Sequence, residues 1–156
     1  MNRYRIERVA VDHAETVAKM AAALLFELSA ATQHVKAADL FAVAQERLRS
    51  RSDFFAYIGF DQNHDPLGVI TVSTAVAIYA AGTVGIIQEL YVAPAHRSAG
   101  LGQLLLATVV DLGRTAGWNR IEIGAPSADR WQRTINFYKA NGFSEIGPRL
   151  HFRISR

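Results

Sequence analysis

Residues 88–102 read QELYVAPAHRSAGLG, and this stretch decides how the chain is expected to fold. Its first part, up to Val92, is largely apolar and typical of a strand, which Pro94 ends because proline cannot donate to a strand ladder. From Gly100 onward the period becomes helical, and Gly117 is placed to end that helix. The stretch therefore predicts a strand, a tight turn and a helix. One face of the helix consists of Leu101, Leu104, Leu105, Thr108, Val109 and Leu112.

The turn between this strand and helix suits an anion. Gly100 and Gly102 lack the Cβ atoms that would keep a ligand away from the main chain. The first turn of a helix presents unpaired N–H groups and a positive dipole end, and Arg97 adds a cationic side chain. Two other glycine loops do not fit, since no Gly-Lys-Ser/Thr follows and Leu105 stands where a dinucleotide fingerprint needs its third glycine. An ordinary strand–helix turn that needs glycine is the alternative interpretation.

Hydrophobic periodicity predicts strands and helices in mixed order over the rest of the chain. Asp12 and Glu15 are spaced as a capping box, with Asp12 as the N-cap of a helix that continues to Leu28. This mixed order predicts an α/β or α+β fold, with about six to seven strands in a sheet covered by about four helices. The predicted strands are 4–9, 54–60, 67–77, 83–92, 120–124, 143–146 and 150–154, and the predicted helices are 12–28, 37–49, 100–117 and 129–140.

Length and composition favour a small soluble protein. The chain has 156 residues, which fits a single domain over 1–156. It has no cysteine, which excludes a disulfide framework, a thiolate zinc site and a cysteine nucleophile, and suits a reducing compartment. Its apolar runs are shorter than a membrane span, and its first residues alternate polar and apolar types, unlike a signal peptide. We therefore expect a cytoplasmic location and no membrane partner.

Charge and histidine content narrow the class of partner. The formal net charge is +3, which favours an anionic partner, either nucleic acid or a polyphosphate cofactor. The arginines that carry most of this charge are scattered, which is more typical of a solvated surface than of a nucleic-acid footprint. The 5 histidines are dispersed, with no pair at metal-ligand spacing, so no metal is expected.

Two motifs resemble the GCN5-related N-acetyltransferase (GNAT) superfamily. Residues 97–102, RSAGLG, are similar to its Arg/Gln-x-x-Gly-x-Gly/Ala signature, and the preceding ELYVAP, residues 89–94, resembles its central strand. Residues 137–143, FYKANGF, are similar to its second motif, Phe-Tyr-x-x-x-Gly-Phe. Many members carry Asn seven residues and Ala four residues before that tyrosine, where this chain has Trp131 and Thr134. The contact that the asparagine makes to the cofactor is therefore not expected here.

The resemblance implies a mostly antiparallel, twisted sheet in which the two central strands splay into a V-shaped gap. It also implies acetyl-CoA as cosubstrate, with its pantetheine arm pairing with the main chain at Leu90, Tyr91 and Val92. The tyrosine that matches Tyr138 lies near the CoA sulfur in this family and is often proposed as the general acid. The CoA pyrophosphate would lie on the turn formed by Arg97, Ser98, Ala99, Gly100, Leu101 and Gly102.

Acetyl transfer without a cysteine predicts direct attack of an amine on the thioester in a ternary complex. Glu89 is the candidate base, acting through a water; simple alternation places it on one strand face with Tyr91 unless a bulge intervenes. A structural carboxylate is the alternative for Glu89, and a core aromatic is the alternative for Tyr138. The N–H groups around Tyr91 and Val92 are candidates for polarising the thioester carbonyl.

The acceptor is expected to be a small-molecule amine, with a protein N-terminus or lysine as the alternative. Glu27, His34 and Tyr79 are candidates for orienting the amine, beside the 29–38 loop and the segment after Gly142. A non-catalytic CoA-binding sensor or interaction module, and a basic nucleic-acid-binding protein, stay open as other classes. A homodimer through a sheet edge or the last strands also stays open.

Overall fold

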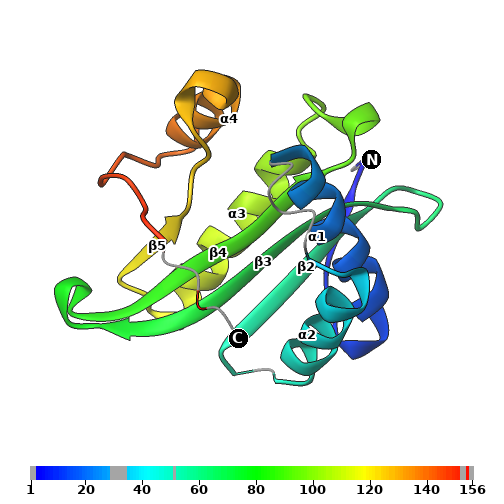
Figure 1. The fold of residues 1–156 in the computed structure, drawn as a ribbon, viewed down its shortest axis with the longest axis horizontal. Helices are drawn as coiled ribbons and strands as arrows, with labels where there is room; N and C mark the ends of the chain where they lie inside the picture. The colour runs from blue at the N-terminus through cyan, green and yellow to red at the C-terminus, as the bar shows by residue number, and fades with distance from the viewer. Residues whose placement is uncertain (1–2, 29–34, 51, 152–153, 155–156) are drawn as a thin grey trace. The chain divides into compact units, whose positions relative to one another are not determined.

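The computed structural model describes residues 3–28, 35–50, 52–151 and 154. The chain forms two compact units, Met1–Ile123 and Gly124–Arg156. The first unit holds a sheet of five strands in the order β1-β2-β3-β4-β5, with antiparallel pairing from β1 to β4 and parallel pairing of β4 with β5 (Figure 1). These strands are β1 (Arg5–Arg8), β2 (Phe54–Phe60), β3 (Pro66–Ala77), β4 (Gly82–Val92) and β5 (Arg120–Ile123).

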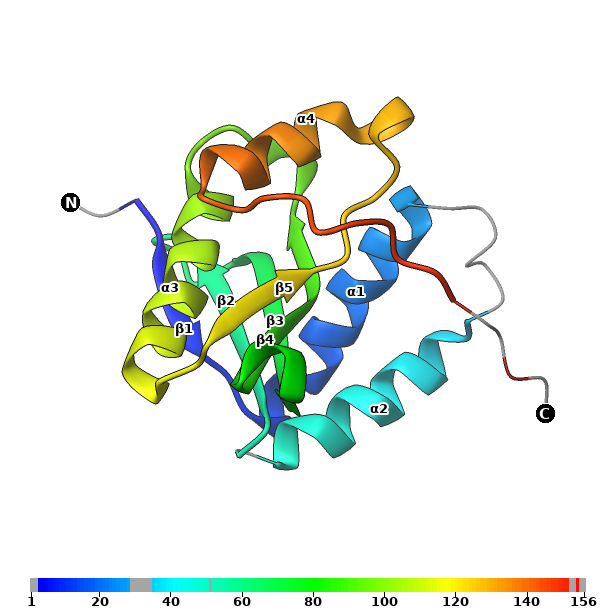
Figure 2. The ribbon, with the colours of Figure 1, turned by 90° about the vertical axis from the view of Figure 1, so that its left-hand side faces the viewer.

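Helices cover both faces of this sheet. Figure 2 shows α3 (Leu101–Ala116) on one face, with α1 (Ala14–Leu28) and α2 (Ala37–Arg49) on the other. Hydrophobic side chains recur on α3 at helical spacing, and Leu101, Leu105 and Val109 have no exposed surface. Gly59 allows the close approach, because a Cβ there would lie 2.4 Å from Leu101 Cδ1. The mixed fold predicted from the periodicity is confirmed.

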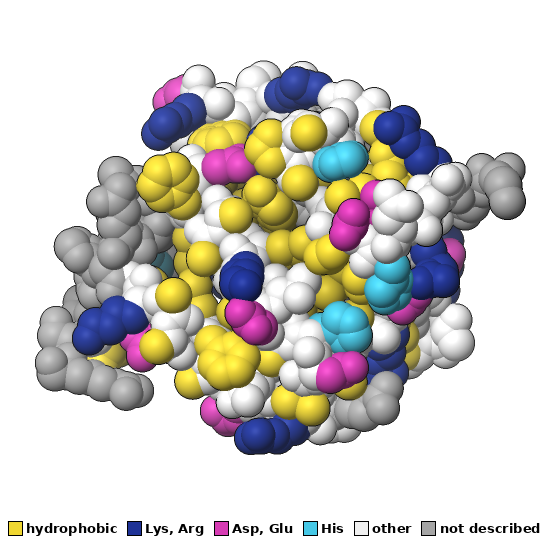
Figure 3. All heavy atoms as spheres, turned by 90° about the vertical axis from the view of Figure 1, so that its right-hand side faces the viewer, with side chains coloured by type: hydrophobic (Ala, Val, Ile, Leu, Met, Phe, Trp, Pro, Cys, Tyr) yellow, Lys and Arg dark blue, Asp and Glu magenta, His cyan; other side chains and the backbone are white. Residues whose placement is uncertain are grey.

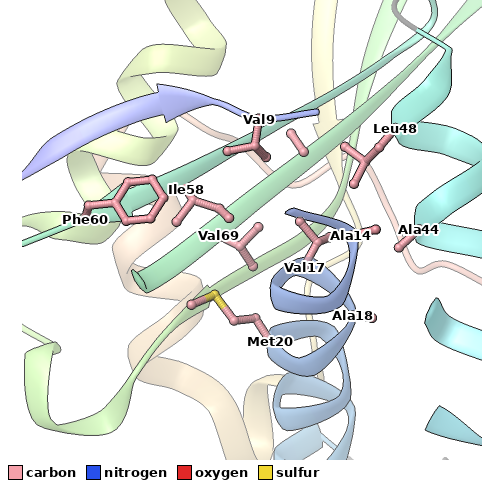
Figure 4. Packing of buried hydrophobic residues seen from close by; sticks show 11 residues of the cluster. Val9, Ala14, Val17, Ala18, Met20, Ala44, Leu48, Ile58, Phe60 and Val69 are labelled. Carbon is pink, nitrogen blue, oxygen red and sulfur yellow. The ribbon is translucent and has the colours of Figure 1, made fainter. Parts of the chain in front are cut away.

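The core between the sheet and the first two helices consists mostly of alanines and β-branched side chains, with Met20, Leu48 and Phe60 among them. Figure 4 shows α1 and α2 contributing alanines and larger apolar residues that meet side chains of β2 and β3. Leu40, Phe54 and Tyr91 pack against this cluster with partial exposure. Tyr91 thus anchors the end of β4 in the core. The cluster contains Val9, Ala14, Val17, Ala18, Met20, Ala44, Leu48, Ala56, Ile58, Phe60 and Val69.

Two local predictions are wrong. The sheet has five strands rather than six to seven, since residues 143–151 form no strand and residues 152–153 lie outside the described part. Ile146 and Leu150 are 73% and 89% exposed, so their apolar alternation finds no neighbouring strand or buried face. Asp12 does not cap α1, because the backbone already turns in a 3-10 helix, Val11–His13, that leads into it. Asp12 instead lies 3.1 Å from His13 Nδ1.

The second unit contains α4 (Ala128–Ala140), close to the predicted 129–140. Trp131 interrupts it with φ −127° and ψ 31°, so the helix is kinked there. Asn141 caps its end, where the side-chain amide donates to Phe137 O at 2.8 Å. The kink therefore falls at the position where the sequence departs from the resembled motif.

Candidate active site

The turn that precedes α3 is open at its glycine. A short 3-10 helix, Pro94–His96, follows β4, and Gly100 then takes the left-handed conformation at φ 89° as the residue before the helix. Apart from Gly100 and its neighbours along the chain, no described atom lies within 4 Å of the place where a Cβ on Gly100 would stand. The helix ladder starts with the Leu104 N–H donating to Gly100 O at 3.1 Å, so the N–H groups of the first turn precede it. The turn, which we call the cradle (residues 97–102), therefore has open space beside its main chain at Gly100.

Arg97 ties this turn to two other elements of the first unit. Its Nε donates to Val92 O at 2.8 Å, and its Nη2 lies 2.7 Å from Glu27 Oε1 near the end of α1. The guanidinium carbon also lies 5.7 Å from the ring centroid of Tyr91. Glu27, a candidate for orienting the amine, is thus an ion-pair partner of Arg97. The role of Arg97 as a CoA ligand stays a prediction.

The main chain of β4 extends beyond the end of its pairing with β5. The parallel pairing of β4 with β5 covers Val84–Ile87 opposite Arg120–Ile123. Residues 88–92 extend beyond the last of these pairs, and 89–92 remain paired with β3 on the other side. This end of the strand, which includes Leu90, Tyr91 and Val92, is where the resemblance predicts the pantetheine arm.

A β-bulge in β4 sets the direction of Glu89. Thr71 pairs with Glu89 and Val72 pairs with Ile87, so Gln88 is an extra residue without a counterpart on β3. Strict alternation would place Ile87 and Glu89 on one face, but the bulge puts them on opposite faces. Glu89 consequently faces the side of α1 and α2, as does Tyr91 in the next pair but one.

The Glu89 carboxylate is bound by a single described side chain, that of Thr71. The Thr71 hydroxyl donates to Glu89 Oε2, and the Glu89 N–H donates to Thr71 Oγ1 at 3.2 Å. Burial raises the pKa of Glu89 above its ordinary value, and the hydrogen bond from Thr71 partly opposes this rise. The result is a half-buried carboxylate that is more basic than a solvated one. Thr71 was missed from the sequence because it sits in a β-branched strand, where threonine is ordinary.

Tyr138, in the second unit, is buried on α4 with 8% exposure. Its ring centroid lies 5.5 Å from that of Phe137 and 5.9 Å from that of Phe143. Burial raises the pKa of Tyr138 to about 12, so the hydroxyl keeps its proton at neutral pH. The side chain therefore combines an aromatic packing role with a protonated hydroxyl.

The other candidates for the acceptor site fall in different surroundings. The Tyr79 hydroxyl donates to Glu122 Oε1 at 3.0 Å, and Arg120 lies 5.2 Å above the Tyr79 ring. Of this polar group at the β3–β4 hairpin, Tyr79 was singled out from the sequence, but Glu122 and Arg120 were not. His34 and most of the 29–38 loop lie outside the described residues.

Three further observations concern surface charge, metal ligands and membrane-spanning helices. On the face drawn in Figure 3, Lys and Arg side chains are scattered among acidic and hydrophobic ones. The described residues include no group of three or more His, Asp or Glu side chains that could hold a metal ion. None of the described helices combines the length and the hydrophobicity needed to span a bilayer.

Comparison with known families decides the class of protein. Residues 22–143 match the model of the acetyltransferase (GNAT) family, which covers more than half of the chain. The chain belongs to the GNAT acetyltransferase family. It is thus an acyltransferase of a family that uses acetyl-CoA. No curated protein sequence matches the chain.

Solved structures show the same fold at low sequence identity. An aminoglycoside acetyltransferase, meta-AAC0020 from an uncultured soil metagenomic sample, in complex with sisomicin, is 18% identical with a TM-score of 0.76, over 99% of this chain and 97% of that one. The aminoglycoside N-acetyltransferase AAC(6')-Iy in complex with CoA is 18% identical with a TM-score of 0.78, over 97% and 94%. The ribosomal-protein-alanine N-acetyltransferase of Brucella melitensis biovar Abortus 2308 is 15% identical with a TM-score of 0.74, over 97% and 99%.

Proposed function

We propose that the whole chain, 1–156, acts as one N-acetyltransferase domain that moves an acetyl group from acetyl-CoA to a primary amine of a small molecule. The amine attacks the thioester directly in a ternary complex. The observation that carries this proposal is the open cradle at Gly100, where α3 begins, in the turn that follows the strand that holds Glu89.

The diphosphate of the coenzyme would bind the main chain of residues 97–102. Open space at Gly100 supports this, because a phosphate needs close access to N–H groups and to the positive end of the helix dipole. The pantetheine arm would pair with residues 90–92, which extend beyond the last pair between β4 and β5. The thioester would then lie near Glu89 and near the N–H groups of Tyr91 and Val92.

Glu89 would take the proton from the amine, directly or through a water. An amine at neutral pH is protonated and must lose a proton before it can attack. A carboxylate whose pKa is raised by burial is a better base than a solvated one, which supports Glu89 in this role. The bulge at Gln88 is the feature that turns the carboxylate away from α3.

Tyr138 would act on the leaving thiolate. A hydroxyl with a pKa of about 12 is protonated throughout the working range and can donate a hydrogen bond to sulfur. Full proton transfer to a thiolate of pKa about 8.5 would be uphill by roughly 3.5 units, or about 5 kcal/mol. The hydroxyl is therefore better suited to stabilise the thiolate by a hydrogen bond than to protonate it completely.

The acceptor class is supported by the small-molecule ligands of similar folds. One neighbour is described in complex with sisomicin, and two of the neighbours reported above are aminoglycoside acetyltransferases. The alternative acceptor, a protein N-terminus, is favoured by the ribosomal-protein-alanine acetyltransferase of similar fold. At this identity the neighbours establish the fold alone, and the amine must be found by assay.

An amine panel with acetyl-CoA tests the proposal. Polyamines, aminoglycosides, amino acids and peptides with free N-termini are each incubated with the enzyme, and released thiol and acetylated product are measured together. We expect turnover with at least one small amine, and a loss of two to four orders of magnitude in Glu89→Gln. Turnover of peptides alone would replace the small-molecule acceptor with a protein. CoA binding without turnover of any amine would instead favour a sensor.

A further inference from the structure

Thr71 is the one fully buried polar residue in the part of the chain that the structure describes, with 1% exposure. It lies in the middle of β3, with apolar neighbours Ile70 and Val72 that are also buried. Burying a hydroxyl costs free energy unless hydrogen bonds replace water, and valine would fill nearly the same volume without that cost. The hydrogen bond that offsets the cost of burying the Thr71 hydroxyl is the one that it donates to Glu89.

The bulge explains why Thr71 meets Glu89 twice. Because Gln88 is inserted into β4, the Glu89 N–H donates to the Thr71 hydroxyl oxygen at 3.2 Å. That hydroxyl has one proton, which it donates to Glu89 Oε2. The side chain of Thr71 is β-branched and stiff at χ1, and the bond from the Glu89 N–H fixes its hydroxyl further, so the hydroxyl restrains the Glu89 carboxylate through Oε2.

We infer that Thr71 is a positioning residue for acetyl transfer, which holds the Glu89 carboxylate by Oε2 and leaves Oε1 to take the proton of the acceptor amine. This inference rests on the proposed base role of Glu89. The proton moves from the amine nitrogen, or from a water that relays it, to the carboxylate, while nitrogen attacks the thioester carbon and the thiolate leaves.

The hydroxyl also affects when Glu89 is ionised. Among the described residues, burial and the Thr71 hydroxyl are the two influences on the Glu89 pKa, the first raising it and the second lowering it. Loss of the hydroxyl therefore leaves the raising influence unopposed. A base with a higher pKa becomes protonated at a higher pH, so the acidic limb of the rate profile moves upward.

The test compares Thr71→Val with Thr71→Ser, using Glu89→Gln as the reference. Valine keeps the shape and loses the hydroxyl, whereas serine keeps the hydroxyl and loses a methyl group. We expect Thr71→Val to lower kcat about 10- to 100-fold with an unchanged KM for acetyl-CoA, and to shift the acidic limb of kcat/KM to higher pH. Thr71→Ser should restore both properties. In a Glu89→Gln background, Thr71→Val should cause no further loss of kcat.

The outcomes separate this inference from the base assignment. If Glu89→Gln keeps wild-type turnover, Glu89 is not the base and the inference fails with it. If Glu89→Gln loses turnover while Thr71→Val keeps the wild-type rate and pH profile, only the role of Thr71 is refuted. A destabilised Thr71→Val that retains the wild-type acidic limb in its folded fraction refutes it as well, since a structural defect does not move that limb.

Discussion

Replacing Gly100 with alanine tests the cradle, and Gly117→Ala is its matched control. Both glycines are left-handed, with φ of 89° and 71°, and an added Cβ on either would meet no described atom within 4 Å apart from those of its neighbours along the chain. Each substitution should therefore cost about 1–2 kcal/mol of unfolding free energy from backbone strain alone. The two glycines flank the same helix of 16 residues, which separates them by roughly 24 Å.

The two variants should differ in binding acetyl-CoA. A methyl group on Gly100 would project into the space proposed for the diphosphate and displace at least one hydrogen bond to a charged oxygen. Such a bond is worth about 1.5–3 kcal/mol, which corresponds to a loss of affinity of roughly 10- to 150-fold. Gly117→Ala should leave the dissociation constant unchanged.

Isothermal titration calorimetry with acetyl-CoA measures the affinity, and thermal denaturation measures the stability of both variants. Similar Tm losses of about 2–8 °C would show that the strain is matched. If Gly100→Ala then binds acetyl-CoA as tightly as Gly117→Ala, the diphosphate does not approach this turn and the reasoning is refuted.

Four further variants test individual side chains. Burial raises the pKa of Glu89 in the folded state, so the stability that Glu89 contributes is complete below its pKa in the unfolded state and declines as pH rises through its folded-state pKa. The Tm of Glu89→Gln relative to that of wild type should therefore increase with pH over that window. A Tm difference that stays constant with pH would contradict the buried carboxylate. Tyr138→Phe should lower kcat about 10- to 150-fold. It should also remove the tyrosinate absorbance transition near pH 12. If the absorbance titration of the variant equals that of wild type, Tyr138 is not the buried phenol. Arg97→Ala should weaken acetyl-CoA binding. Glu27→Gln should not, because it removes only a partly exposed ion pair worth less than about 1 kcal/mol. If calorimetry gives the two variants equal affinities for acetyl-CoA, Arg97 is not a ligand of the coenzyme.

Local patterns in the sequence predicted most of the fold. The helix at 37–49 and the strand at 54–60 agree with the structure to the residue, because their apolar period and their flanking turns are local signals. The strands predicted after Phe143 failed for the opposite reason. Alternation of Ile146 and Leu150 predicts a strand only if another strand or a core lies beside it, and both side chains are exposed.

The candidate site was predictable where it depends on main-chain geometry. The turn at Gly100 follows from glycine spacing and a change of period. The partners of Arg97 and Glu89 could not be predicted from local sequence, because Glu27 lies 70 residues from Arg97 and Thr71 lies 18 residues from Glu89. Those contacts depend on the packing of α1 and on a bulge that shifts the register of two strands by one residue. Alternation from Tyr91 correctly places Glu89 on the face of α1 and α2, whereas alternation continued from Ile87 would place it on the face of α3.

An amide NMR titration of the protein with CoA tests most directly whether the start of α3 binds the diphosphate. We predict that the backbone N–H resonances of Gly100, Leu101 and Gly102 shift as CoA is added and saturate at the affinity found by calorimetry, while that of Gly117 stays in place. If CoA binds to saturation and the three resonances do not move, the coenzyme is held elsewhere and the proposed site is wrong.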